Sequence, residues 1–190
     1  IPKTQDFNGA TQEGVGYLEL MIRDGVRSST SDAFLKPIRH RSNLTVQTSA
    51  LTEKILLENK HVKGVRFTIN GVVHEVGAHE VILSAGAINS PQLLMLSGIG
   101  RASELEAHGI SVSHTLNGVG ENLQDHIVAP LRYSCKKPVS ISNQLGPLGR
   151  ARIGLEWLLF KRGLGASNFF EVGAFFDSGS GAPFINMQHE

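Results

Sequence analysis

The sequence predicts a mixed α/β or α+β fold, and three patterns support this prediction. Residues 62–76 alternate apolar and polar side chains around an Asn-Gly pair, residues 80–84 form a continuous apolar run, and residues 148–159 repeat leucines at helical spacing. The 190 residues include 41% hydrophobic and 18% charged amino acids. This balance is typical of a globular protein that buries a core.

Charge, cysteine content and hydropathy exclude several classes of protein. The formal net charge of +1 provides no basic surface for nucleic acid. A single cysteine, Cys135, excludes an internal disulfide framework and a Cys-based zinc site, and it is compatible with a reducing cytoplasm without requiring one. The longest apolar runs, such as residues 81–83, are too short for a transmembrane segment.

The first 58 residues predict a short helix and then strands. Residues 9–27 are rich in Gly and alternate weakly. A short helix with Ser or Thr caps is expected over residues 29–35, ended by Pro37. Alternating apolar residues predict strands at residues 43–48 and 51–57.

The hairpin is the most clearly encoded local element. Val65, Phe67 and Ile69 share one face of the first strand, and the Asn70-Gly71 pair supplies the two positive φ angles of a type I′ turn. The second strand, residues 72–76, therefore returns antiparallel.

The next segment reads as a strand that turns into a helix. The continuous apolar run of residues 80–84 is typical of a strand buried on both faces of a parallel sheet. Small residues follow at 85–87, and Ser90 and Pro91 are expected as N-cap and first helical residue. Gly98 suits the end of this helix.

The rest of the chain continues the mixed pattern. Pro130 and the Lys-Lys-Pro sequence at 136–138 interrupt it, which predicts a domain boundary near residue 130. The further elements expected are a helix at 103–108 closed by Gly109, a strand at 110–116, a Gly-rich loop at 117–126 and a strand at 169–176. An amphipathic helix is expected at 148–159, and its apolar stripe is expected to face a core, with a partner-binding face as the alternative.

Most catalytic sequence templates are missing from the chain. It has no complete Gly-x-Gly-x-x-Gly, no Walker loop, no Gly-x-Ser-x-Gly and no His-Glu-x-x-His sequence. One dense stretch remains at residues 86–100. Unpaired N–H groups at the start of its helix suit a phosphate or an anionic ring, although the stretch is also compatible with an ordinary strand-to-helix turn.

Residues 86–100 read Gly-Ala-Ile-Asn-Ser-Pro-Gln-Leu-Leu-Met-Leu-Ser-Gly-Ile-Gly. This stretch resembles the second signature of the glucose–methanol–choline (GMC) flavoprotein oxidoreductases. Residues 27–46 and the Gly-Val-Gly-Glu-Asn-Leu-Gln-Asp-His sequence at 118–126 resemble two further conserved segments of that family. The likeness spans nearly the whole chain and is nearest to choline-dehydrogenase-like members.

The resemblance implies two partial domains within a longer protein. Residues 1–130 would form part of an FAD-binding domain with a Rossmann-like sheet, with an insertion near residues 10–40 that is also compatible with the substrate domain. Residues 131–190 would begin an α+β substrate-binding domain with an antiparallel sheet. The family's Gly-rich FAD motif and its catalytic His would lie outside this chain, so none of the eight histidines is assigned a catalytic role.

The resemblance also assigns residues to the cofactor. One lies on the strand whose backbone holds the FAD adenine, three lie at the strand end beside the FAD, and four lie on a loop near the cofactor. In order, these residues are Thr52; Ser84, Ala85 and Gly86; and Asn122, Leu123, Asp125 and His126. Alternatively, Asn122 and Asp125 only hold their own loop through local hydrogen bonds. Gly86, Gly98 and Gly100 are expected to bracket the turn beside the flavin.

Two residues are implied in substrate binding. Glu171, with Phe170 before it, matches the segment whose carboxylate faces trimethylammonium in choline-oxidising members. A carboxylate beside aromatic rings suits a quaternary cation. Relatives that act on uncharged alcohols also carry Glu there, so a neutral alcohol stays an alternative.

The implied activity is FAD-dependent oxidation of an alcohol, choline-like or another primary alcohol, to an aldehyde. Hydride would pass to flavin N5, and the electrons would go to a quinone or O₂. The rival hypothesis is a non-catalytic or degenerate module without bound FAD. Because a partial sheet exposes strand edges, the 190 residues alone are expected to be poorly soluble and to bind no FAD.

Overall fold

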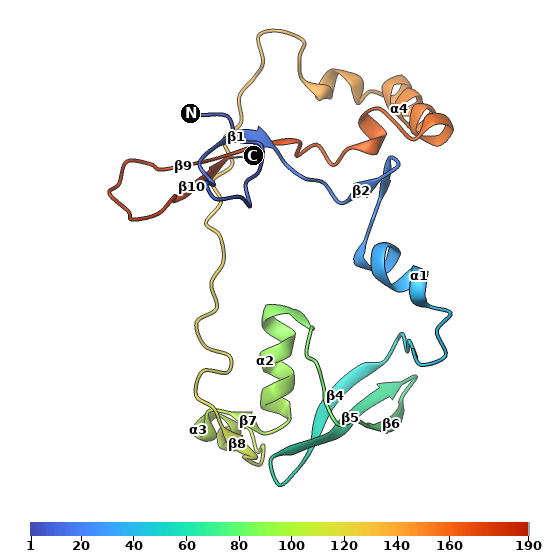
Figure 1. Ribbon diagram of the computed structural model, residues 1–190, viewed down its shortest axis with the longest axis vertical. Coiled ribbons are helices and arrows are strands. Elements are labelled where there is room, and N and C mark those ends of the chain that lie inside the picture. Colours follow the sequence, from blue (N-terminus) through green and yellow to red (C-terminus); the bar gives the residue numbers. More distant parts are fainter. Residues whose placement is uncertain (190) are drawn as a thin grey trace. The chain divides into compact units, whose positions relative to one another are not determined.

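The computed structural model describes residues 1–189, which form two compact units (Figure 1). One unit comprises residues 45–131, and the other combines residues 1–44 with the chain from residue 132 onward. The fold is mixed α/β with small sheets, most of them antiparallel. No helix within residues 1–189 is long and apolar enough to cross a membrane.

The larger sheet of the 45–131 unit has the antiparallel strand order β4-β5-β6, from strands Leu51–Glu58, His61–Ile69 and Val72–Gly77. The predicted hairpin is confirmed, because Ile69 pairs with Val72 and the turn residues Asn70 and Gly71 have φ angles of 50° and 82°. The strand predicted at 51–57 is confirmed as β4. A bulge interrupts β4 between Thr52 and Lys54.

Helix α2 (Gly86–Leu96) packs against β4 through its C-terminal end (Figure 1). Ser97 is fully buried, and its hydroxyl accepts a hydrogen bond from the Ile55 N–H at 2.8 Å. The same hydroxyl donates to the Leu93 carbonyl at 2.6 Å. The apolar core of this unit is small and consists of Ile55, Leu93, Leu105 and Val119.

The chain after α2 forms a short parallel pair. Strand β7 (Ile99–Gly100) lies beside β8 (His114–Thr115), and helix α3 (Ala102–Ala107) connects them. The predicted helix at 103–108 is confirmed, and Gly109 ends it with a φ of 69°. The strand predicted at 110–116 is reduced to the two residues of β8.

Three sequence predictions for the 45–131 unit and its junction with the other unit are wrong. Residues 80–84 are not a strand, because no strand among the described residues pairs with them, and a continuous apolar run needs such neighbours to form a sheet. Ser90 is not the N-cap of α2: the helix begins at Gly86, includes Pro91, and the Ser90 hydroxyl accepts from the Ala85 N–H at 3.0 Å. Residues 43–48, at the junction of the units, are likewise not a strand.

The second unit contains the antiparallel sheet β1-β9-β10, built from Gly14–Tyr17, Val172–Phe176 and Met187–His189. The strand predicted at 169–176 therefore begins three residues later. The rings of Phe7 and Phe175 contact each other, with centroids 5.1 Å apart, and Ala174 is buried. This pairing joins the first residues of the chain to its last sixty.

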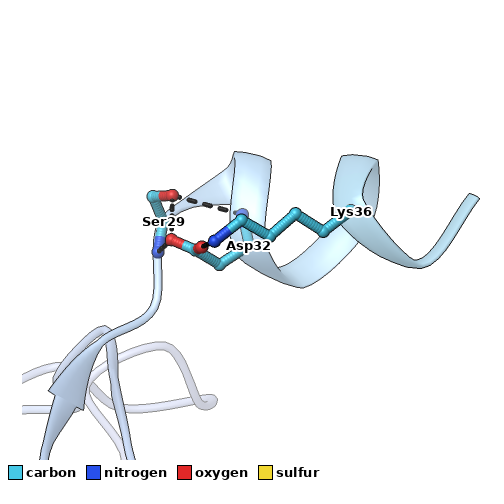
Figure 2. A network of polar contacts seen from close by, with 3 residues as sticks. All are labelled: Ser29, Asp32 and Lys36. Atoms are coloured by element: carbon cyan, nitrogen blue, oxygen red, sulfur yellow. Dashed lines mark hydrogen bonds and ion pairs between the residues drawn. The ribbon is translucent and has the colours of Figure 1, made fainter. Parts of the chain in front are cut away.

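A short helical segment lies between β3 (Val26–Arg27) and residue 40. It consists of a π-helical turn, η1 (Ser31–Leu35), followed by α1 (Lys36–Ile38), so Pro37 lies inside the helical segment instead of ending it. Figure 2 shows how Ser29 and Asp32 cap it reciprocally: the Asp32 N–H donates to the Ser29 hydroxyl, and the Ser29 N–H and hydroxyl donate to the Asp32 carboxylate.

The Asp32 carboxylate also pairs with the Lys36 ammonium one turn later (Figure 2). These contacts with Lys36 and then Ser29 stabilise the ionised carboxylate, and they lower the pKa of Asp32 from 3.8 to about 2. The polar groups at the start of this helical segment are therefore bonded by the side chains of Ser29, Asp32 and Lys36.

Helix α4 (Pro147–Phe160) lies between the 3₁₀ turns η2 (Ile141–Gln144) and η3 (Leu164–Ala166). The Trp157 indole N–H donates to the Gly25 carbonyl at 2.7 Å, which attaches the helix to the turn between β2 (Ile22–Arg23) and β3. The predicted helix is confirmed, but the expectation that its apolar stripe faces a core is wrong, because no residue of α4 is buried.

Candidate cofactor site

The N-terminal end of α2 is open and lined by small residues. Ser84, Ala85 and Gly86 are all exposed, and the N-cap residue Ala85 makes no side-chain cap. Gly86 has a φ of 91°, and no atom lies within 4 Å of the position that a Cβ would occupy. The helix start therefore presents backbone N–H groups and partial positive charge to an unfilled space, which suits an anionic group.

The C-terminal end of the same signature segment is packed against the chain itself. A Cβ on Gly98, whose φ is 82°, would lie 2.4 Å from the Ser111 carbonyl oxygen. A Cβ on Gly100 would lie 3.2 Å from Met95 Cγ. Both glycines are thus buried by their own protein, and their place at the turn beside the flavin stays a prediction.

Residues 117–121 continue from this packed end. Val119 is only 8% exposed, and a Cβ on Gly120 would be 3.4 Å from Met95 Cε. Arg101 and Glu121 form an ion pair, with 2.5 Å between Nη2 and Oε1. The predicted loop thus starts at a defined position beside the end of α2.

The candidate residues of the following segment are exposed. Asn122 has a left-handed φ of 56°, and Leu123 is 68% exposed. The Asp125 carboxylate accepts from the His126 N–H at 2.8 Å, which is the local hydrogen bond that the alternative interpretation of this loop expects. All residues from 122 to 126 are exposed, so their side chains are accessible to a ligand.

Thr52 lies on the edge strand β4, directly opposite Phe67 of β5 and next to the bulge. The Phe67 ring is stacked on the His74 imidazole of β6, with centroids 5.5 Å apart and planes at 18°. Thr52, Phe67 and His74 therefore form one row across the sheet. All eight cofactor candidates belong to the 45–131 unit.

The two substrate candidates lie in the other unit, at the start of β9. The Glu171 side chain is exposed, and its backbone carbonyl accepts from the Leu18 N–H at 2.9 Å. Phe170 is 54% exposed. Phe169 has a φ of 69°, a conformation that is rare for an aromatic residue and that concentrates at functional sites. No sequence pattern could have indicated this backbone geometry.

Metal chemistry has no support in the described part of the chain, where no three His, Cys, Asp or Glu side chains gather around a common point. Among the predicted cofactor residues, Gly86 lies at an exposed helix start and Thr52 lies on an edge strand.

Comparison with known proteins identifies the family. Residues 1–128 match the family model described as GMC oxidoreductase. The chain belongs to the GMC oxidoreductase family. The resemblance of residues 27–46, 86–100 and 118–126 to that family is thereby confirmed.

The chain is similar to choline dehydrogenases over almost its whole length. It is 47% identical over 189 residues to the oxygen-dependent choline dehydrogenase of Photobacterium profundum, covering 99% of this chain and 33% of the relative. It is 44% identical over 188 residues to the human mitochondrial choline dehydrogenase, covering 98% and 32%. The chain thus spans about a third of the length of the curated relatives it matches.

The structure also resembles solved flavoproteins. An FAD-dependent oxidoreductase from Chaetomium thermophilum superposes with a TM-score of 0.77 at 25% identity, covering 92% of this chain and 32% of that one. The mixed α/β fold of the chain is therefore similar to that of an FAD-dependent oxidoreductase.

Proposed function

We propose that this chain is part of an FAD-dependent enzyme that oxidises a primary alcohol, choline or a choline-like molecule, to the aldehyde. The observation that carries the proposal is the 47% identity to a choline dehydrogenase across 99% of the chain. The exposed, Gly-lined start of α2 supports it, because it provides a position where backbone meets a ligand without an intervening side chain.

We assign the 45–131 unit to the FAD-binding part of the enzyme and the other unit to the substrate-binding part. The first assignment rests on the open end of α2 and on the exposed backbone of β4 around Thr52. The second rests on the antiparallel sheet that carries Glu171 and Phe170. The first 44 residues would then belong with the substrate-binding part.

The residues present fit FAD. Gly86 leaves the space that a Cβ would fill, and the uncapped start of α2 offers N–H donors and partial positive charge to a diphosphate or an anionic ring. The Thr52 backbone would hold the adenine, and Asn122, Leu123, Asp125 and His126 would lie along the cofactor. When bound, FAD supplies the hydride acceptor, N5 of the flavin, and a quinone or O₂ would reoxidise it.

The chain's own part in the reaction would be binding and orientation. Glu171 would place a carboxylate beside the cationic head of the substrate, with the Phe170 ring shielding it from water. The proton of the alcohol would be removed by a base outside these residues. The second candidate function is a non-catalytic module that binds no FAD. Many large apolar residues of the chain are exposed, and such a surface also suits a module that binds another protein.

The experiment uses the full-length protein, in which these residues are joined to segments that correspond to the rest of the relatives' length. Glu171→Gln should raise the KM for choline about tenfold or more and leave the KM for a neutral primary alcohol within about twofold, because only the cation loses a charge partner. Asp177→Asn, at an exposed loop after β9, is the matched control. An unchanged ratio of the two KM values would contradict the substrate proposal.

The cofactor proposal has its own readout. The purified full-length protein should show the visible absorbance of a stoichiometric flavin, which choline should bleach without oxygen. A protein of correct fold without flavin would favour the non-catalytic module.

A further inference from the structure

Arg101 connects the signature segment to the loop that follows it. It comes directly after β7, and its guanidinium bonds the Glu121 carboxylate with 2.5 Å between Nη2 and Oε1. The two residues are separated by 20 positions in the sequence. Both side chains are about half exposed, at 47% and 44%, so the pair lies at the surface of the 45–131 unit.

Two other contacts and one buried side chain reinforce the same junction. The Leu116 N–H donates to the Gly100 carbonyl at 2.9 Å, one residue before Arg101. Val119 is buried, and Gly120 lies against the Met95 side chain of α2. Together these contacts anchor residues 116–121 to the packed end of α2.

Beyond Glu121 the character of the chain changes. Asn122 has a left-handed φ of 56°, and all residues from 122 to 131 are exposed and without regular secondary structure. Within this described stretch, the Asp125 carboxylate bonds only the next residue's N–H. The direction in which the segment leaves the unit is therefore set at Glu121 and Asn122.

We propose that Arg101 is a positioning residue: by holding Glu121, it sets the course of residues 122–126 toward the bound cofactor. The inference rests on the proposed function, which assigns cofactor contacts to these residues. It adds a residue that contacts no ligand itself. Lys differs from Arg in the shape of its charged group and in the flexibility of its stem, so Lys at position 101 should replace Arg only partly.

A merely structural ion pair would behave differently. Exposed ion pairs contribute little to stability, and the chain offers a second one for comparison. Arg66 bonds Glu75 with 2.7 Å between Nη2 and Oε1, and its side chain is 43% exposed. This pair links two neighbouring strands of the hairpin and precedes no candidate loop, so it is a matched control.

The test measures FAD affinity and thermal stability in the full-length protein. Arg101→Ala and Glu121→Gln should each raise the dissociation constant of FAD about three- to fivefold, and Arg101→Lys should recover part of the loss. The double variant Arg101→Glu, Glu121→Arg restores the ion pair with the charges exchanged. It should bind FAD more tightly than Arg101→Glu alone or Glu121→Arg alone. Arg66→Ala should lower the melting temperature as much as Arg101→Ala does and leave FAD affinity unchanged.

The outcomes distinguish the positioning role of Arg101 from the proposed function of the protein. If the wild-type protein binds FAD and Arg101→Ala binds it equally well, the positioning role is refuted and the proposed function stands. An equal loss of affinity in Arg66→Ala would also refute it, because a general loss of stability would then explain both. A wild-type protein that folds without FAD would overturn the proposed function and this inference together.

Discussion

The two ends of the 86–100 segment belong to one family signature and have opposite environments. At the C-terminal end, Ser97 is fully buried and Gly98 lies against the Ser111 carbonyl. At the N-terminal end, Gly86 is exposed and nothing occupies the space beside it. Helix α2 separates the two ends by eleven residues. The comparison teaches that glycines in one motif can serve different purposes, close packing at one end and an open surface at the other.

The largest expected effect is at the packed end. Gly98→Ala should destabilise the protein by about 2 kcal/mol or more, because the new Cβ would be 2.4 Å from a backbone oxygen and the φ of 82° disfavours any side chain. Urea unfolding measures the loss. Gly109→Ala is the control, since Gly109 has a φ of 69° and open space beside it. Equal losses in the two variants would show that the contact with Ser111 is unimportant.

A smaller loss is expected at Ser97. Ser97→Ala removes the acceptor of the buried Ile55 N–H, which should cost about 1–3 kcal/mol. Ser90→Ala removes the hydroxyl that accepts from the exposed Ala85 N–H, where water can substitute, and should cost less than about 1 kcal/mol. Thermal unfolding of both variants tests the contrast between the two ends. A reversed order would contradict it.

The smallest effect is expected at the start of the helical segment η1. This start is capped by Ser29 and Asp32, whereas the start of α2 has no side-chain cap. Because the pKa of Asp32 is lowered to about 2, the ionised carboxylate contributes stability above pH 3.8, and this contribution is lost as the pH falls toward 2. Lys36→Ala should raise the pKa of Asp32 toward 3.8, as measured by NMR titration of the carboxyl carbon. A pKa that stays near 2 in this variant would show that the Lys36 contact is not the main cause.

Elements whose structure is determined by residues close to one another in the sequence were predictable. The hairpin at Asn70-Gly71 was predictable because alternation and turn residues are local signals. Residues 80–84 were not, because a parallel strand needs partners that lie elsewhere in the sequence. The burial of Gly98 depends on Ser111, and the exposed stripe of α4 depends on what packs against it, so neither could be derived from periodicity.

The candidate site was predictable only in part for the same reason. Physical reasoning indicated an anion-binding helix start near residue 86, and the family resemblance supplied the other candidate residues. Neither source indicated the left-handed backbone of Phe169, which no side-chain pattern specifies. Neither indicated the pairing of Arg101 with Glu121, because the two residues are 20 positions apart in the sequence.

The open end of α2 is proposed to hold the cofactor, and one matched pair of glycine variants tests this proposal. Gly86→Ala and Gly71→Ala place the same methyl group at glycines with φ angles of 91° and 82°, each with no atom within 4 Å. Backbone strain is therefore alike. In the full-length protein, Gly86→Ala should raise the dissociation constant of FAD about tenfold, whereas Gly71→Ala should leave it within about twofold. Equal FAD affinities in the two variants would contradict the account.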